Sequence, residues 1–121
     1  MELIVKCLIA FVALEHLLFL WIEMFAWETT GRKTFKTFPE DLFKPTKALA
    51  ANQGLYNGFL AAGLIWSLFI TDHKWQRNIS MFFLGCVIIA GIFGALTASK
   101  RIFIVQALPA IIALILVCLC Q

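Results

Sequence analysis

Charged side chains are scarce in this sequence. Only 14% of its 121 residues are charged, whereas 62% are hydrophobic and the mean hydropathy is +0.92. A soluble domain typically carries about 25% charged residues, so this composition excludes an ordinary soluble protein. The lack of charge predicts an integral membrane protein whose main partner is the lipid bilayer.

Metal-binding spacings are also absent from the sequence. The four cysteines form no CxxC pair and no metal-spaced set with histidine or aspartate, so we expect them to be packing residues. His16 is the only histidine inside a long apolar stretch. A mononuclear zinc ion there would need Glu15, Glu23 or a second subunit to complete its ligands. No metal is predicted, and the sequence identifies no cofactor.

Basic residues are few, and their distribution indicates topology. The net charge is +3, and it implies no nucleic-acid partner. Seven basic residues lie in the first and third connections between apolar segments: Arg32, Lys33, Lys36, Lys44, Lys47, Lys100 and Arg101. The other side has three, which are Lys6, Lys74 and Arg77. By the positive-inside rule, the first and third loops are cytoplasmic and both termini face outward.

Four apolar segments account for most of the chain, at residues of about 3–27, 48–70, 79–98 and 102–120. Each approaches the roughly 20 residues that a helix needs to cross the hydrocarbon core. The first exceeds the roughly 7–15 apolar residues of a secretory signal and has no small-residue cleavage site after it, so we expect it to be retained. The sequence therefore predicts one all-α domain over residues 1–121, an integral membrane four-helix bundle of up-down-up-down topology.

The first loop, roughly residues 28–47, is the one long connection. Pro39, Glu40 and Asp41 are typical of the start of a short helix, because proline suits the first turn and acidic residues favour its positive end. Three phenylalanines lie among the basic residues of the loop: Phe35, Phe38 and Phe43. This pattern predicts a short interfacial segment on the cytoplasmic membrane surface, where basic side chains approach anionic headgroups.

Ionisable residues interrupt the first apolar segment at Glu15, His16 and Glu23. A charged residue costs about 2.5–3.5 kcal/mol at the centre of a membrane helix on insertion scales, and such residues usually mark a functional site. At about 100° per residue, Glu23 and His16 lie about 80° and 100° from Glu15. All three therefore share one face, which can point into a bundle.

The second apolar segment carries a polar face of its own. Four polar residues fall within about 140° of its helical surface: Asn52, Gln53, Tyr56 and Asn57. At about 1.5 Å per residue, Tyr56 and Asn57 approach the depth of Glu15 and His16 when the two helices are antiparallel. We therefore expect these two polar faces to meet.

Polar residues of all four segments lie in the cytoplasmic half of the predicted membrane. Thr97 ends the third segment on that side, and Gln106 lies about one turn into the fourth. Together they predict a funnel open to the cytoplasm, with the Glu15–His16 pair at its floor. The candidate ligand-binding or proton-coupling residues are Glu15, His16, Glu23, Asn52, Gln53, Tyr56, Asn57, Thr97 and Gln106.

Small residues form smooth faces on the second and third segments, and in the second segment this face is expected on the side of the helix opposite the polar residues. They are Gly54, Gly58, Ala61 and Ala62 in the second, and Gly91, Gly94, Ala95 and Ala98 in the third. Small residues spaced four apart let two backbones approach closely. We therefore expect the second and third helices to pack against each other through these faces.

Four sequence stretches carry a family resemblance: ALEHLLFLWIEMF, NQGLYNGFLAAGL, GALT and QALPA. In this combination, which runs along essentially the whole chain, the sequence resembles the domain-of-unknown-function 1304 family of small bacterial four-helix membrane proteins. The resemblance implies four helices and a location in the bacterial plasma membrane. It implies no activity.

Three functions fit these features. The first is binding or transport of a small polar or cationic molecule, with Glu15 as the charged contact and release of its proton coupled to binding. The second is an enzyme for a lipophilic substrate, with Tyr56 and the Glu15–His16 pair in acid–base roles. The third is an interaction protein without a ligand. Because four short helices enclose little interior, we expect a homo-oligomer, either a dimer or a trimer.

Overall fold

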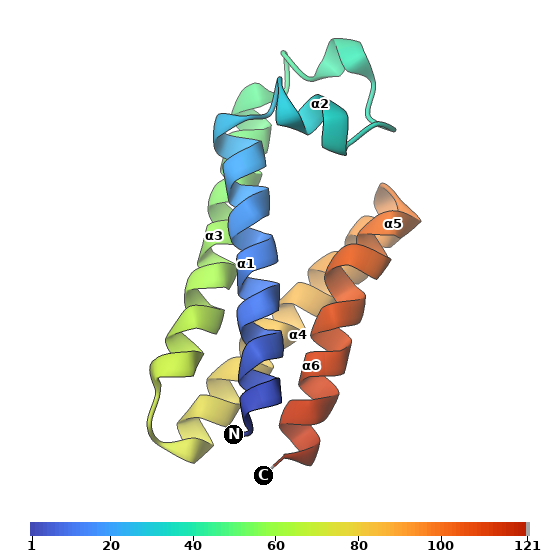
Figure 1. Ribbon diagram of the computed structural model, residues 1–121. Coiled ribbons are helices and arrows are strands. Elements are labelled where there is room, and N and C mark those ends of the chain that lie inside the picture. The colour runs from blue at the N-terminus through green and yellow to red at the C-terminus, as the bar shows by residue number, and fades with distance from the viewer. Residues whose placement is uncertain (121) are drawn as a thin grey trace. The chain divides into compact units, whose positions relative to one another are not determined.

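The computed structural model describes residues 1–120, and every regular element among them is helical. Four longer helices are α1 (Leu3–Phe25), α3 (Lys47–Phe69), α4 (His73–Thr97) and α6 (Leu108–Leu119) (Figure 1). The shorter elements are α2 (Thr30–Thr34), η1 (Glu40–Leu42), α5 (Lys100–Ile102) and η2 (Phe103–Ala107). The all-α prediction is confirmed for these residues.

Three helical segments are long and apolar enough to cross a membrane. They are α1, α4 and the continuous stretch Lys100–Leu119, which contains α5, η2 and α6. This agrees with the predicted membrane protein. The predicted second span forms as the 23-residue helix α3, but its polar residues lower its hydropathy and it is not among the three. Four inserted helices in an up-down arrangement therefore stay a prediction.

The predicted fourth helix is interrupted near its start. Residues Phe103–Ala107 form a π-helical turn, in which the backbone N–H of Leu108 donates to the carbonyl of Phe103. Pro109 lies just beyond, in the first turn of α6. Proline has no N–H and its ring clashes with the carbonyl four residues earlier, so an α-helix cannot run through this position unchanged. The wider turn accommodates the proline.

The chain divides into two compact units, one of residues His16–Phe59 and one that joins Met1–Glu15 to the chain from Leu60 onward. The second of these contains the main apolar core. On α1, Val5, Ile9 and Val12 recur at helical spacing and are fully buried. The core is completed by Ala13, Leu64, Leu84, Val87, Ala110, Ala113 and Val117. Within this unit, α4 and α6 run side by side (Figure 1).

The small residues pack closely, but against partners other than those expected. A Cβ atom on Gly91 would lie 2.7 Å from the Cβ of Ala107 in η2, and one on Gly94 would lie 2.9 Å from the Cγ2 of Ile102 in α5. Gly54 and Gly58 of α3 lie instead against α1. For these four glycines, the predicted packing of the second helix on the third is therefore wrong. Helical periodicity identifies a smooth face and does not identify the helix that meets it.

The first loop belongs to the His16–Phe59 unit and packs around Trp27. The Phe43 side chain is fully buried, and its ring centre lies 4.9 Å from that of Trp27. Arg32 lies over the Phe43 ring and donates to a carboxylate oxygen of Glu40 at 2.6 Å. The predicted short helix after Pro39 is present as η1. The loop is thus internally packed, and its position at a membrane interface stays a prediction.

Candidate functional site

A buried carboxylate on α1 is held by two side chains of α3. Glu23 is 3% exposed. Its Oε2 accepts a hydrogen bond from Gln53 Nε2, and its Oε1 accepts one from Asn57 Nδ2, each at 2.6 Å. Gln53 and Asn57 are four residues apart, so they lie one above the other on one helix face. We call these three residues the Glu23–amide cluster.

Two glycines of α3 allow this close approach. A Cβ atom on Gly54 would lie 2.8 Å from Met24 Cγ, 3.0 Å from Glu23 Cβ and 3.2 Å from the Leu20 carbonyl oxygen. A Cβ atom on Gly58 would lie 2.6 Å from Leu20 Cδ1. We expected the glycines and the polar residues on separate faces of the second helix. In the structure they meet α1 together, and the glycines bring the amides within reach of the carboxylate.

The hydrogen bonds to Glu23 come from neutral groups. Amide donors satisfy both carboxylate oxygens, but they carry no positive charge. The ion pairs among the described residues join Arg32 to Glu40 and Lys47 to Glu28, and Glu23 is in neither. Among the described residues, neither of its hydrogen-bond donors therefore gives an ionised carboxylate here a counter-ion. A buried charge without a counter-ion is energetically costly, so a carboxylate in this position favours binding of a proton or a cation.

The structure changes the predicted register of the two polar faces. Asn57 was expected at the depth of Glu15 and His16, whereas it hydrogen-bonds to Glu23, two turns further along α1. His16 is fully buried, and its ring meets that of Phe19 edge-on, with ring centres 5.5 Å apart. Glu15 is half-buried, and its Oε1 is enclosed without a hydrogen-bond partner among the described residues. The amides of α3 therefore converge on Glu23 and not on the expected Glu15–His16 pair.

The remaining predicted site residues lie outside the cluster's hydrogen bonds. Asn52 and Tyr56 are exposed on α3, and the Tyr56 ring lies 5.8 Å from that of Phe59. Thr97 is also exposed, and its hydroxyl donates to the carbonyl of Phe93 in its own helix. Gln106 lies in the π-helical turn η2. Whether these residues contact a ligand stays a prediction.

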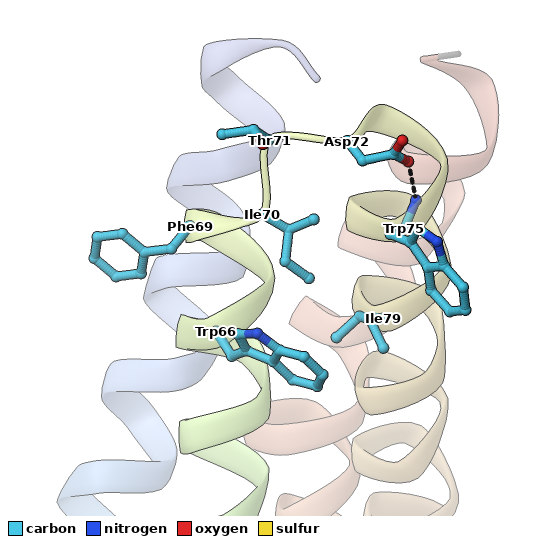
Figure 2. A pocket seen from close by; sticks show the side chains of 7 residues that line it. All are labelled: Trp66, Phe69, Ile70, Thr71, Asp72, Trp75 and Ile79. Carbon is cyan, nitrogen blue, oxygen red and sulfur yellow. Dashed lines mark hydrogen bonds between the residues drawn. The ribbon is translucent and has the colours of Figure 1, made fainter.

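A hollow of about 500 Å³ lies at the turn between α3 and α4. None of the predicted site residues lines it, because its walls are Trp66, Phe69, Ile70, Thr71, Asp72, Trp75 and Ile79. Figure 2 shows the Asp72 carboxylate accepting the backbone N–H of Trp75, at 2.9 Å, with the two indoles on either side of Ile79. Sequence reasoning missed this hollow. The available signal was a tryptophan at each side of the turn, a placement typical of a membrane interface.

These features define a class of protein: a small, all-helical chain with three segments of membrane-spanning length and a carboxylate held between two helices. Within that class, the chain belongs to the family described as Protein of unknown function (DUF1304), whose model matches residues 10–118. The matched range includes the Glu23–amide cluster, and it confirms the family resemblance seen in the sequence.

One relative is the Uncharacterized protein YpaA of Lactococcus lactis subsp. lactis (strain IL1403). The two are 35% identical over 106 residues, which are 86% of this chain and 87% of the relative. No solved structure matches the chain.

Proposed function

We propose that this chain is a membrane protein that binds or transports a small, positively charged species, with Glu23 as the anionic contact. In the proposed arrangement four helices cross the bacterial plasma membrane, and the first and third loops are cytoplasmic. The observation that carries the proposal is the buried Glu23 carboxylate, whose hydrogen-bond partners are two neutral amides. Among the described residues, the hydrogen-bond partners of this one negative charge include no basic side chain.

The position of the cluster supports access from the cytoplasm. Glu23 lies two residues before the end of α1 at Phe25, next to the basic first loop. Gln53 is exposed although its amide contacts the buried carboxylate. Rotation of this one side chain therefore opens a route from the surface to Glu23.

Proton coupling through Glu15 is a separate part of the proposal. Its Oε1 is enclosed and has no hydrogen-bond partner among the described residues. An enclosed carboxyl oxygen without a donor can accept a proton. We therefore assign proton exchange to Glu15 and cation contact to Glu23.

Thermal unfolding of the purified full-length chain in detergent tests the proposal. A cation that binds only the folded state raises the stability by about 2.7 kcal/mol at 100 times its dissociation constant. The midpoint is measured in sodium, potassium and methylammonium chloride, with the bulky N-methylglucamine salt as the reference at equal ionic strength. We expect at least one of the three cations to raise the midpoint above the reference.

Matched glutamate variants decide whether Glu23 is responsible for the cation-dependent rise in the unfolding midpoint. Glu23→Gln keeps the side-chain shape and removes the charge, so we expect it to abolish the cation-dependent rise. Glu2→Gln removes an exposed glutamate and should keep the rise. The proposal fails if no cation raises the midpoint of the unmodified chain, or if the rise persists in Glu23→Gln. If the rise persists in Glu23→Gln, the polar residues of the cluster serve helix packing alone.

A further inference from the structure

We propose that the Glu23–amide cluster is a coordination site for one dehydrated sodium ion. This inference rests on the proposed function and names the species that Glu23 binds. The juxtaposition that carries it is a buried carboxylate with a glutamine and an asparagine amide, each 2.6 Å from one of its oxygens.

The cluster can present oxygen atoms alone to an ion. Each amide group has a carbonyl oxygen as well as its NH2 group, and a rotation of about 180° at the end of the side chain exchanges them with little steric cost. In the described state the NH2 groups of Gln53 and Asn57 face the carboxylate. After rotation, one amide oxygen lies beside each carboxylate oxygen, and hard cations select oxygen ligands.

The charge of the cluster favours a monovalent ion. One carboxylate cancels one positive charge, and both amides are neutral. A divalent ion would leave a net positive charge beside an apolar helix, which is costly without a second anion.

The packing around the cluster favours a small ion over an organic cation. The nitrogen atoms that would make way for the ion are only 2.6 Å from the carboxylate oxygens. Beside them, a single added Cβ atom on Gly54 would lie 3.0 Å from the Cβ of Glu23. A bare ion needs the amides to rotate and to withdraw slightly from the carboxylate, which is a smaller change than a methyl-bearing ammonium would require.

Direct binding of ²²Na⁺ to the full-length chain in detergent tests the inference. We expect saturable binding to the unmodified protein, with lithium competing and with potassium and methylammonium competing more weakly. Asn57→Leu removes one ligand oxygen at similar volume, and we expect it to weaken binding about tenfold or more. Asn78→Leu makes the same exchange at an exposed position of α4 and should leave binding unchanged.

Gln53→Met provides a second variant, which changes an exposed side chain of the cluster. It removes the donor to Glu23 Oε2, so we expect a lower unfolding midpoint in N-methylglucamine chloride as well as weaker sodium binding, and binding is measured at a temperature where both proteins are folded. Equal sodium binding in Asn57→Leu, Gln53→Met and the unmodified chain would overturn the inference.

Failure of the inference and failure of the proposed function give different results. If methylammonium or potassium stabilises the chain through Glu23 and sodium does not bind, the ion assignment is wrong and the proposed function stands. If no cation acts through Glu23, both are wrong.

Discussion

Glu15 and Glu23 are both glutamates of α1, but their surroundings differ. Both oxygens of Glu23 accept a hydrogen bond from α3, whereas an enclosed oxygen of Glu15 has no partner among the described residues. Bonds to a charged group contribute about 1.5–3 kcal/mol, more than bonds between neutral groups. At the scale of residues, the two hydrogen bonds to Glu23 therefore stabilise the contact between α1 and α3, in addition to the binding role that we propose for the carboxylate.

Asn57→Leu should destabilise the chain by about 1.5–3 kcal/mol, because it leaves Glu23 Oε1 buried without a donor. The free energy of unfolding is measured by detergent titration in mixed micelles. In the double variant Glu23→Leu, Asn57→Leu the second substitution should cost less than it does alone, since the two residues interact directly. A loss near 0.6 kcal/mol, the average for a hydrogen bond between membrane helices, would show that the carboxylate gives this bond no additional strength.

At the scale of elements, glycines set the distance between α1 and α3. The atoms around Gly54 include the Leu20 carbonyl oxygen and the Glu23 Cβ, which cannot move without shifting α1. The atom nearest to Gly58 is the end of the flexible Leu20 side chain. Gly85 of α4 has open space around its Cβ position. The three glycines should therefore respond differently to the same substitution.

Alanine substitution measures that difference. We expect Gly54→Ala to lower the free energy of unfolding by about 1–3 kcal/mol through overpacking. Gly58→Ala should change it by less than about 1 kcal/mol, because Leu20 can rotate and alanine favours the helix. Gly85→Ala should raise it by about 0.5–1 kcal/mol. Equal effects at Gly54 and Gly85 would contradict the described packing of α3 on α1.

The first loop packs internally around Trp27 and Phe43. Phe43→Ala should open it, because removal of a buried phenylalanine costs about 3–5 kcal/mol. Limited trypsin digestion checks this, since Lys33 and Lys36 are exposed sites within the loop and cleavage should accelerate when the loop opens. Phe25→Ala, which removes a side chain that is 72% exposed, should leave the rate unchanged. Equal rates for both variants would contradict the internal packing of the loop.

The sequence predicts helices and faces better than it predicts partners. The four long apolar segments, the helix after Pro39 and the polar stripe of α3 follow from composition, proline position and a repeat of about 3.6 residues. The pairing of Asn57 with Glu23 does not follow from them. Sliding α3 along α1 by two turns keeps the same faces together but changes every residue contact. The hollow near Asp72 is also unpredictable from spacing, since it depends on how two side chains turn at a tight connection.

At the scale of the whole molecule, α3 decides the number of membrane crossings. Three segments have both the length and the hydropathy of a membrane span, whereas α3 has the length but not the hydropathy. If α3 crosses, the first loop and the α3–α4 turn lie on opposite sides of the membrane. If it does not, they lie on the same side.

Single cysteines placed in a cysteine-free variant distinguish these arrangements. Lys36→Cys and Thr71→Cys are both at exposed positions. We expect a membrane-impermeant thiol reagent to label Thr71→Cys in intact cells, and to label Lys36→Cys only after the cells are opened. Labelling of both from outside, or of neither, would contradict four crossings.

The contact of the Gln53 and Asn57 amides with Glu23 bears on how the chain enters the membrane. As an isolated segment, α3 would expose two amides to lipid, and α1 would expose an unpaired carboxylate. Once the two helices are together, each polar group is satisfied by the other. If α3 crosses the membrane, as we propose, the two helices should therefore enter the bilayer as one hairpin, and α1 should become stable there only after α3 has been synthesised.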